Sequence, residues 1–328
     1  MSNTPLFSVP GMVQDRQRIE DALVAAVDTK DSYLNELARH LIVAGGKRIR
    51  PVLTVASARS TGASLKDGII DAVVQGGIAC ELVQTGSLYH DDVIDESATR
   101  RGVETVNAKW GNLQAILAGD FLLARASEIA ASLGAEVAGL LGNTIARLCE
   151  GEIEQLRHTY DVRRPEAAYF SSIAGKTASL FSTAARIGGI VAGIERPLVD
   201  ALTAYGLAYG MVFQIVDDIL DVTATDDQLG KPAGHDMVEG VYTLPVLRTL
   251  ANDGVAADEL GDLLGHPLDP VVRDKALSIV RSGDGVVYAL EIAGGYVRAA
   301  TDACALLPDN AASAALRAAP GALVDSVR

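Results

Sequence analysis

The chain has 328 residues, of which 42 are acidic and 28 are basic, so its formal net charge is −14. Hydrophobic residues make up 49% of it, which permits a large core and excludes a disordered protein. The acidic balance argues against a nucleic-acid-binding protein and against a basic membrane-surface patch. Three cysteines, far apart and set among apolar residues, indicate buried thiols in a reducing compartment rather than disulfides or a zinc site.

No repeat, linker or low-complexity tract divides the chain. Residues 1–12 are predicted to be mobile, and residues 13–328 to form a single domain. The N-terminal stretch lacks the basic and apolar regions of a targeting signal. The longest uncharged stretch, residues 201–216, is shorter than the roughly 18–20 residues that span a bilayer. We therefore expect a cytoplasmic protein without a transmembrane segment.

The placement of prolines predicts helices. No proline occurs between Val52 and Arg164, and apolar residues recur there at helical spacing. Pro51, Pro165 and Pro197 stand where helices would begin, a position at which the missing N–H costs nothing. The sequence therefore predicts an all-α bundle of about ten or more helices.

An Asp-Asp-x-x-Asp pattern occurs twice, each time at the end of an apolar helical stretch. The six residues are Asp91, Asp92 and Asp95 in the first copy, and Asp217, Asp218 and Asp221 in the second. Within each copy the first and last aspartates lie on one helix face, where their charges repel. A solvated acidic helix end would explain one copy. Two copies favour binding of a hard cation such as Mg²⁺.

Basic residues accompany these carboxylates. Arg100 and Arg101 follow the first copy, and residues 45–51 read Gly-Gly-Lys-Arg-Ile-Arg-Pro. Guanidinium groups grip phosphate oxygens with two hydrogen bonds, so arginine pairs beside metal-binding carboxylates suit a diphosphate. The arginines expected to be ordinary surface cations or ion-pair partners are Arg48, Arg59 and Arg125.

On these motifs the chain resembles the trans-isoprenyl diphosphate synthases, the polyprenyl synthetase family. The likeness also includes Arg-Arg-Gly at 100–102, Gly-Asp at 119–120, Gly-Lys-Thr at 175–177 and Phe-Gln at 213–214. The resemblance implies a helical bundle, usually a homodimer, around a deep central cavity. It further implies condensation of isopentenyl diphosphate, head to tail and repeatedly, with an allylic diphosphate to give an all-trans product.

Site residues follow from the resemblance position by position. Three Mg²⁺ ions bound together with the allylic diphosphate are expected, with ligands Asp91, Asp95, Asp217 and Asp221; Asp92 and Asp218 complete the two catalytic motifs. The residues expected to contact the allylic substrate are Arg100, Lys176, Thr177, Gln214 and Lys231. Those expected to hold isopentenyl diphosphate are Lys47, Arg50, Gln84 and Arg101. Gln84 stands where the family often has His, and Val241 where it often has Lys, which removes one cationic contact.

Product length is expected to depend on Gly86 and Ser87, five and four residues before Asp91. In the family that this chain resembles, bulky aromatic residues at these positions stop short products. Small residues here predict an open tunnel and a product longer than geranylgeranyl diphosphate, suited to a quinone side chain. The alternative is that they merely permit close helix packing.

Other functions remain open at the level of sequence. A short-chain synthase making farnesyl or geranylgeranyl diphosphate would carry the same motifs. A terpene cyclase would have a different second metal motif, and it would lack the second diphosphate site. A non-catalytic binding subunit of a heteromeric synthase would tend to lose one or both aspartate motifs, whereas this chain keeps both.

Overall fold

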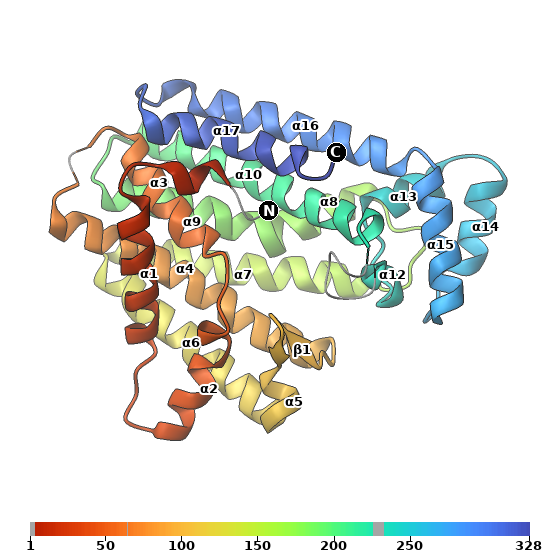
Figure 1. Ribbon diagram of the computed structural model, residues 1–328, viewed down its shortest axis with the longest axis horizontal. Coiled ribbons are helices and arrows are strands. Elements are labelled where there is room, and N and C mark those ends of the chain that lie inside the picture. The colour runs from red at the N-terminus through yellow and green to blue at the C-terminus, as the bar shows by residue number, and fades with distance from the viewer. Residues whose placement is uncertain (1–3, 64, 226–232) are drawn as a thin grey trace. The chain divides into compact units, whose positions relative to one another are not determined.

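The computed structural model describes residues 4–63, 65–225 and 233–328 (Figure 1). In these residues the protein has more than ten α-helices, and its only strands, β1 (Thr99–Arg100) and β2 (Val103–Glu104), form an antiparallel hairpin. The all-α prediction is confirmed. The chain divides into two compact units whose boundaries fall within helices, among them α7 (Ala135–Arg157), α10 (Arg196–Thr223) and α17 (Ala311–Asp325).

Unit 1 comprises Met1–Ile145, Leu180–Gly206 and Ala303–Ala319. Besides parts of α7, α10 and α17, its helices are η1 (Pro5–Ser8), α1 (Met12–Ala26), α2 (Ser32–Val43), α3 (Ile49–Ser60), α4 (Asp67–Ile94), α5 (Val106–Trp110), α6 (Asn112–Ser132), most of α9 (Ser179–Val191) and η3 (Cys304–Leu306). The long helix α4 lies at its centre, packed against α6, α3 and α1.

Glycines allow α4 to approach its neighbours closely. A Cβ atom on Gly77 would lie 2.7 Å from the Cα of Pro51 in α3, and one on Gly76 would lie 2.4 Å from a methyl carbon of Ile187 in α9. A Cβ atom on Gly86 would lie 3.0 Å from the carbonyl oxygen of Gly119 in α6. Real Cβ atoms rarely come so close to other atoms. These glycines are therefore packing positions.

The N-terminal residues that the structure describes are packed. Thr4 caps η1, and Leu6, Val9 and Met12 are buried against the rest of unit 1. This corrects the expectation of a mobile segment for residues 4–12, while residues 1–3 lie outside the described residues. The prediction went wrong because prolines and a glycine interrupt this short stretch, so its four apolar side chains do not form a recognisable helical period.

Unit 2 comprises Ala146–Ser179, Leu207–Asp302 and Pro320–Arg328. Besides the remaining parts of α7, α10 and α17, it contains α8 (Glu166–Ile173), the π-helical turn η2 (Ala174–Ala178), α12 (His235–Val238), α13 (Leu244–Ala251), α14 (Val255–Leu263), α15 (Pro270–Ser282) and α16 (Gly285–Ala303). Asp269 caps α15 by accepting hydrogen bonds from the N–H groups of Val271 and Val272.

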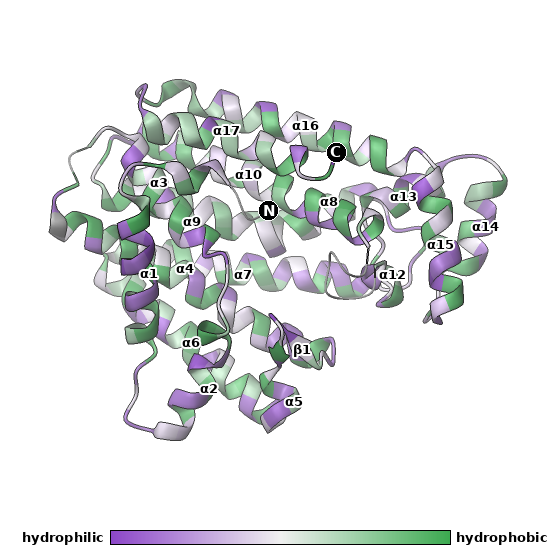
Figure 2. Ribbon diagram, viewed as in Figure 1, coloured by the Kyte–Doolittle hydropathy of each residue, from purple (hydrophilic) through white to green (hydrophobic). Residues whose placement is uncertain are grey.

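Helix α10 is both long and apolar. Among the described residues it alone is long and apolar enough to cross a membrane, but 67% of its most hydrophobic window is buried within the protein. That burial is typical of a core helix. Figure 2 shows the contrast with α1 and α15, which both carry broad hydrophilic faces.

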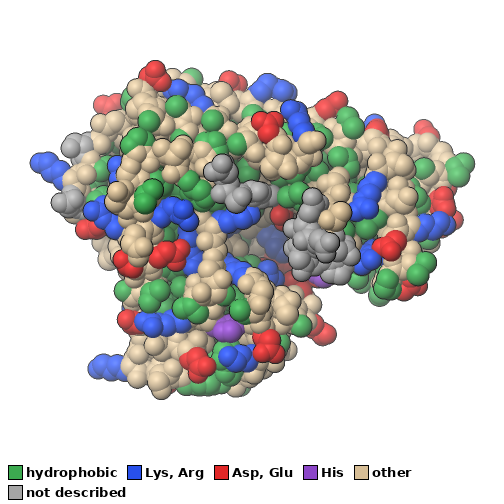
Figure 3. Space-filling view, in the orientation of Figure 1, with side chains coloured by type: hydrophobic (Ala, Val, Ile, Leu, Met, Phe, Trp, Pro, Cys, Tyr) green, Lys and Arg blue, Asp and Glu red, His purple; other side chains and the backbone are tan. Residues whose placement is uncertain are grey.

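The three cysteines differ in their surroundings. Cys80 and Cys304 are buried, and burial raises the pKa of their thiols to about 12 and about 11. Cys149 is exposed, which corrects the expectation that all three belong to the core. On the face drawn in Figure 3, acidic and basic side chains are interspersed, so the net negative charge is not concentrated there.

Candidate active site

The first aspartate motif ends α4. Asp91 is half-buried, Asp92 is buried and Asp95 is exposed at the helix C-cap, where its N–H donates to the Asp91 carbonyl oxygen at 2.8 Å. Burial raises the pKa of the Asp92 carboxyl, and the Arg100 guanidinium beside it acts in the opposite direction. Arg100 Nε donates to Asp92 Oδ1 at 2.5 Å, while Asp92 Oδ2 is buried without a hydrogen-bond partner.

A tight hairpin follows this motif and presents two arginines. Thr99 pairs with Glu104 and Arg100 with Val103, which leaves a two-residue turn of Arg101 and Gly102. Both turn residues have positive φ (55° and 79°), the signature of a type I′ turn. Just after the hairpin, the side-chain amide of Asn107 in α5 donates to the Asp92 carbonyl oxygen at 2.9 Å and so ties α5 to the end of α4.

Three further cations predicted to bind a diphosphate, Lys47, Arg50 and Arg101, lie in or contact the segment around the start of α3. Arg101 Nη1 donates to the Leu41 carbonyl oxygen at 2.7 Å and also to that of Gly45. The guanidinium carbon of Arg50 lies 4.4 Å from the centroid of the Phe181 ring, a cation–π contact. Lys47 is exposed. Arg101 and Arg50 are thus held in place, whereas the Lys47 ammonium extends into solvent.

Two of the arginines expected to be ordinary ion-pair partners, Arg59 and Arg125, form ion pairs in the structure. Arg59 Nη2 lies 2.6 Å from the buried Asp15 carboxylate, and Arg125 Nη1 lies 2.6 Å from Glu128. Arg48 is paired as well, but it is fully buried, which a surface cation is not.

The second aspartate motif lies in unit 2, where a chain of hydrogen bonds reaches it. Thr177 Oγ1 donates to Gln214 Oε1 at 2.7 Å, and Gln214 Nε2 donates to Asp218 Oδ1 at 2.8 Å. The hydroxyl of Tyr169 donates to Asp218 Oδ2 at 2.6 Å. Both oxygens of this middle aspartate are therefore engaged by the protein, and Asp217, which is exposed, and Asp221 are left as ligand candidates.

The π-helical turn η2 positions Lys176 and Thr177. Its backbone contacts α7 so closely that a Cβ atom on Gly151 would lie 2.4 Å from the Lys176 nitrogen. A Cβ atom on Gly175 would lie 2.7 Å from the Arg147 carbonyl oxygen. Lys176 Nζ forms an ion pair with Glu152 Oε2 at 2.5 Å. Such π-turns are frequent at functional sites, because the wide turn redirects side chains.

Tyr169 and Arg164 are residues that the sequence did not single out. Tyr169 is buried, and burial together with the Asp218 charge raises the pKa of its phenol well above the usual range. The Arg164 guanidinium carbon lies 5.7 Å from the centroid of the Tyr169 ring. One feature of the sequence could have identified Tyr169. It precedes Lys176 by seven residues, which is two turns of a helix.

Removing the buried charge of Asp218 should change how stability depends on pH. Burial raises the pKa of its carboxyl to about 7, so the folded protein holds a proton there that the unfolded chain releases near pH 4. Stability is therefore lost as pH rises from about 4 to about 7, by up to about 4 kcal/mol. In metal-free buffer, Asp218→Asn should make this decline smaller, as measured by thermal denaturation at several pH values. Asp302→Asn, which alters an exposed carboxylate of unit 2, should leave the decline unchanged.

Asp221 anchors the segment that follows the residues not described. Its side-chain Oδ2 accepts a hydrogen bond from the Asp236 N–H at 3.2 Å, and its carbonyl oxygen accepts one from the Gly234 N–H at 2.8 Å. Lys231, assigned to the allylic substrate, lies outside the described residues. Val241 is half-buried, and its N–H donates to the Asp236 carbonyl oxygen at 2.8 Å. Because this residue is a valine, the position offers no charged side chain.

The donor set fits magnesium. Within the described ranges, no three carboxylate, imidazole or thiolate side chains converge closely enough to hold a metal ion by themselves. Mg²⁺ is commonly bound by one or two carboxylates, with water and substrate phosphate oxygens completing its shell. Half-buried Asp91 and exposed Asp95 at one helix end, beside the unsatisfied buried Oδ2 of Asp92, suit that mode.

The structure corrects the placement of Gly86. Its missing side chain would point at α6, where Leu123 Cγ would also lie 3.3 Å from a Cβ atom, so Gly86 does not border open space. Ser87 is half-buried, and helical spacing puts it on the face of α4 that carries Gln84 and Asp91. Of the two residues, only Ser87 thus lies on the helix face of Asp91.

The family profile, the sequence relatives and the solved structures that resemble this chain all indicate the same family. The polyprenyl synthetase family profile matches residues 31–278. The chain is 38% identical over 304 residues to heptaprenyl diphosphate synthase component 2 of Geobacillus stearothermophilus, covering 92% of this chain and 93% of the relative. It is 38% identical over 303 residues to nonaprenyl diphosphate synthase of Mycobacterium tuberculosis, covering 92% and 89%. A polyprenyl synthase from Caulobacter crescentus, solved with calcium and isoprenyl diphosphate, superposes with a TM-score of 0.90 at 33% identity, covering 98% and 96% of the chains.

Proposed function

Since the chain belongs to the polyprenyl synthetase family, we propose that it condenses isopentenyl diphosphate head to tail with an allylic diphosphate, as a trans-prenyltransferase. The product is an all-trans polyprenyl diphosphate longer than geranylgeranyl diphosphate, in keeping with the relatives named heptaprenyl and nonaprenyl diphosphate synthases. One observation supports this reading most strongly. Two Asp-Asp-x-x-Asp helix ends each have cationic side chains in their own unit.

The first substrate is the allylic diphosphate, with Mg²⁺ held by Asp91, Asp95, Asp217 and Asp221. When bound, three such ions would stabilise the negative charge that develops on the departing diphosphate. The related Caulobacter structure, which is complexed with calcium and isoprenyl diphosphate, supports a divalent ion in the reaction of this family.

The side chains proposed to contact the allylic diphosphate or the cation derived from it are Arg100, Lys176, Thr177, Gln214 and Lys231. Lys176 supplies a point charge to phosphate oxygens once it exchanges its contact with Glu152. The Thr177 hydroxyl donates to Gln214, so its lone pairs are directed away from that bond and can face a carbocation.

Isopentenyl diphosphate is proposed to bind at Lys47, Arg50, Gln84 and Arg101. One nitrogen of Arg101, Nη1, donates to the segment before α3, and the guanidinium has further N–H groups that can donate to phosphate oxygens. Gln84 adds a neutral amide donor. Because no side chain here is an evident base, the proton lost after condensation is assigned to the released diphosphate.

Two further properties are proposed. A homodimer is favoured by exposed Leu113, Ile116 and Leu117, which form one apolar stripe along α6. A cytoplasmic location is favoured by the burial of α10, the described helix that passes the length and composition test for a membrane span. The molar mass of the purified protein in solution tests the homodimer against a monomer that needs a second kind of subunit, as the relative named component 2 suggests.

The activity is tested with purified protein, Mg²⁺, isopentenyl diphosphate and a panel of allylic diphosphate primers, followed by chain-length analysis of the products. Elongation beyond twenty carbons without any added protein is the expected result. Products that stop at fifteen or twenty carbons with every primer would identify a short-chain synthase, and no product at all would support a binding subunit.

The two diphosphate sites should separate in kinetics. Lys47→Ala and Arg101→Ala remove contacts assigned to isopentenyl diphosphate, so each should raise KM for that substrate by about tenfold and leave KM for the allylic primer within about twofold. Lys176→Ala should do the reverse. Initial rates with one substrate varied and the other saturating measure this.

Lys30→Ala serves as the control, because Lys30 is exposed and belongs to neither group. If all three variants affected both substrates equally, the division into two sites would be wrong. Protein stability should be compared alongside, since Lys176→Ala leaves Glu152 without its cation.

A further inference from the structure

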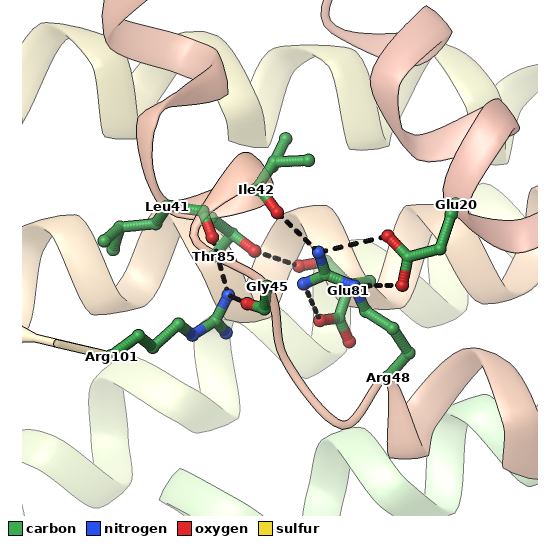
Figure 4. A network of polar contacts seen from close by, with 8 residues as sticks. All are labelled: Glu20, Leu41, Ile42, Gly45, Arg48, Glu81, Thr85 and Arg101. Atoms are coloured by element: carbon green, nitrogen blue, oxygen red, sulfur yellow. Dashed lines mark hydrogen bonds and ion pairs between the residues drawn. The ribbon is translucent and has the colours of Figure 1, made fainter. Parts of the chain in front are cut away.

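Arg48 is a fully buried cation in the loop that carries Lys47. Its side chain is 1% exposed, and each of its terminal groups has a partner. Nε lies 3.0 Å from Glu20 Oε1, Nη1 lies 3.2 Å from Glu81 Oε1, and Nη2 donates to the Ile42 carbonyl oxygen at 2.7 Å (Figure 4). Arg48 is thus directed into unit 1, away from any position in which it could meet a substrate.

The backbone of Arg48 has a conformation that is unfavourable for a residue with a side chain. It is the N-cap of α3, with φ 50° and ψ 39°, the left-handed region that glycine and asparagine normally occupy. No capping hydrogen bond from the side chain stabilises this helix start. The ion pairs to α1 and α4 contribute to holding the loop in this conformation.

Glu81 is the partner that ties the loop to α4. Its side chain is 4% exposed, and it lies ten residues before Asp91 on the same helix. Thr85 donates its hydroxyl to the Glu81 carbonyl oxygen at 2.9 Å, so the side chain of Thr85 is also bound to this turn of α4. The loop before α3 is thereby held at a fixed place along the helix that ends in the first aspartate motif.

A second arginine clamps the same loop. Arg101 donates to the carbonyl oxygens of Leu41 and Gly45, as Figure 4 shows. Gly46 lies between the two guanidinium groups, since a Cβ atom on it would be 2.8 Å from Arg48 Nη1 and 3.2 Å from Arg101 Cζ. Burial lowers the pKa of Arg101, with the Glu81 charge opposing and the Arg48 charge adding to this effect. The two cations and Glu81 form one electrostatic group.

We propose that Arg48 and Glu81 are positioning residues for the isopentenyl diphosphate site. They fix the backbone of residues 45–50 so that Lys47 and Arg50 point their charges at one diphosphate, and they contact no substrate themselves. This inference rests on the proposed function only for the identity of that diphosphate. The fixing of the loop by a buried ion pair is a property of the chain that can be measured separately.

Kinetics test the effect on substrate. Arg48→Met and Glu81→Met each keep the side-chain bulk and remove one charge of the pair. Each should raise KM for isopentenyl diphosphate by about ten- to a hundredfold, since displacement of binding groups by about 1 Å has effects of that size, and leave KM for the allylic primer within about twofold.

Limited proteolysis tests the loop without any reference to activity. Trypsin cleaves after accessible lysines and arginines, and exposed Lys47, next to buried Arg48, lies in a loop that should be too rigid to enter the protease. In Glu81→Met the sequence around Lys47 is unchanged. Cleavage after Lys47, measured by mass spectrometry, should nevertheless become several-fold faster. This readout remains valid even if the protein turns out to have no condensation activity.

Two controls separate positioning from general destabilisation. Arg59→Met removes another ion pair of α3, to the buried Asp15, and should lower Tm without changing KM for isopentenyl diphosphate or cleavage at Lys47. The double variant Arg48→Met/Glu81→Met replaces the pair by apolar groups, which should recover Tm but not KM.

The proposal would be overturned by either of two results. One is a rise in both KM values in proportion to the loss of Tm, as a purely structural pair would give. The other is faster cleavage at Lys47 with KM for isopentenyl diphosphate unchanged, since a loosened loop would then not matter for binding.

Discussion

Asp91→Ala and Asp217→Ala should each lower the rate of condensation by about 10³-fold, while the fold is retained. Each removes a carboxylate assigned to Mg²⁺ and leaves the hydrogen bonds of the neighbouring buried aspartates, Asp92 and Asp218, in place. In metal-free buffer the variants should be at least as stable as the parent protein, because like charges four residues apart on a helix repel one another. Rates at saturating Mg²⁺ and thermal denaturation with a chelator measure the two effects.

The matched control is Asp71→Ala, which alters an exposed carboxylate near the other end of α4 and should leave the rate unchanged. Added Mg²⁺ should raise Tm of the parent protein in the presence of diphosphate, and less so in the two variants. Near-normal rates in both variants would show that the aspartate motifs are not the metal site.

Ser87→Phe and Gly86→Phe, one residue apart, should give different results. Ser87 is half-buried on the face of α4 that carries Asp91, so a phenyl ring there should obstruct a growing prenyl chain and shift products to twenty carbons or fewer. Gly86 lies against the backbone of α6, so a ring there should separate two packed helices and cost at least about 3 kcal/mol of stability. Product analysis by chain length and thermal denaturation distinguish the outcomes.

Ser87→Ala is the control for side-chain size, since it removes only the hydroxyl that donates to the Gln84 carbonyl oxygen at 3.0 Å. It should leave products unchanged. Should Gly86→Phe fold normally and shorten the product, the position would line the tunnel after all and the helices would have to part there without loss of stability.

Much of the site could be predicted because the signals are local. The aspartate motifs, the Gly-Gly-Lys-Arg-Ile-Arg-Pro segment and Gly-Lys-Thr each fall within a few residues, and the chemistry of clustered carboxylates and cations needs no tertiary information. The type I′ turn at Arg101 and Gly102 is likewise a local feature, although its positive φ values were not anticipated from the sequence.

What could not be predicted depends on which helix face meets which neighbour. A glycine before Asp91 fits both an open tunnel and a close crossing, and only the position of Gly119 decides between them. The same holds for Arg48, which looks like any loop cation until Glu20 and Glu81, from two other helices, are seen around it. Tyr169 was overlooked because its partner, Asp218, is 49 residues away in the chain.

The glycines of α4 also bear on how the chain folds. The interior of this helix contains Gly76, Gly77 and Gly86, each about 1 kcal/mol less favourable than alanine there, so α4 is weak as an isolated helix. Its contacts run to Pro51, to Gly119 and, through Gly76, to Ile187 in α9. During synthesis, α4 can therefore gain its full set of neighbours only after residue 187 has left the ribosome. Folding of the first aspartate motif should accordingly be late, and a truncated chain ending before α9 should not fold around it.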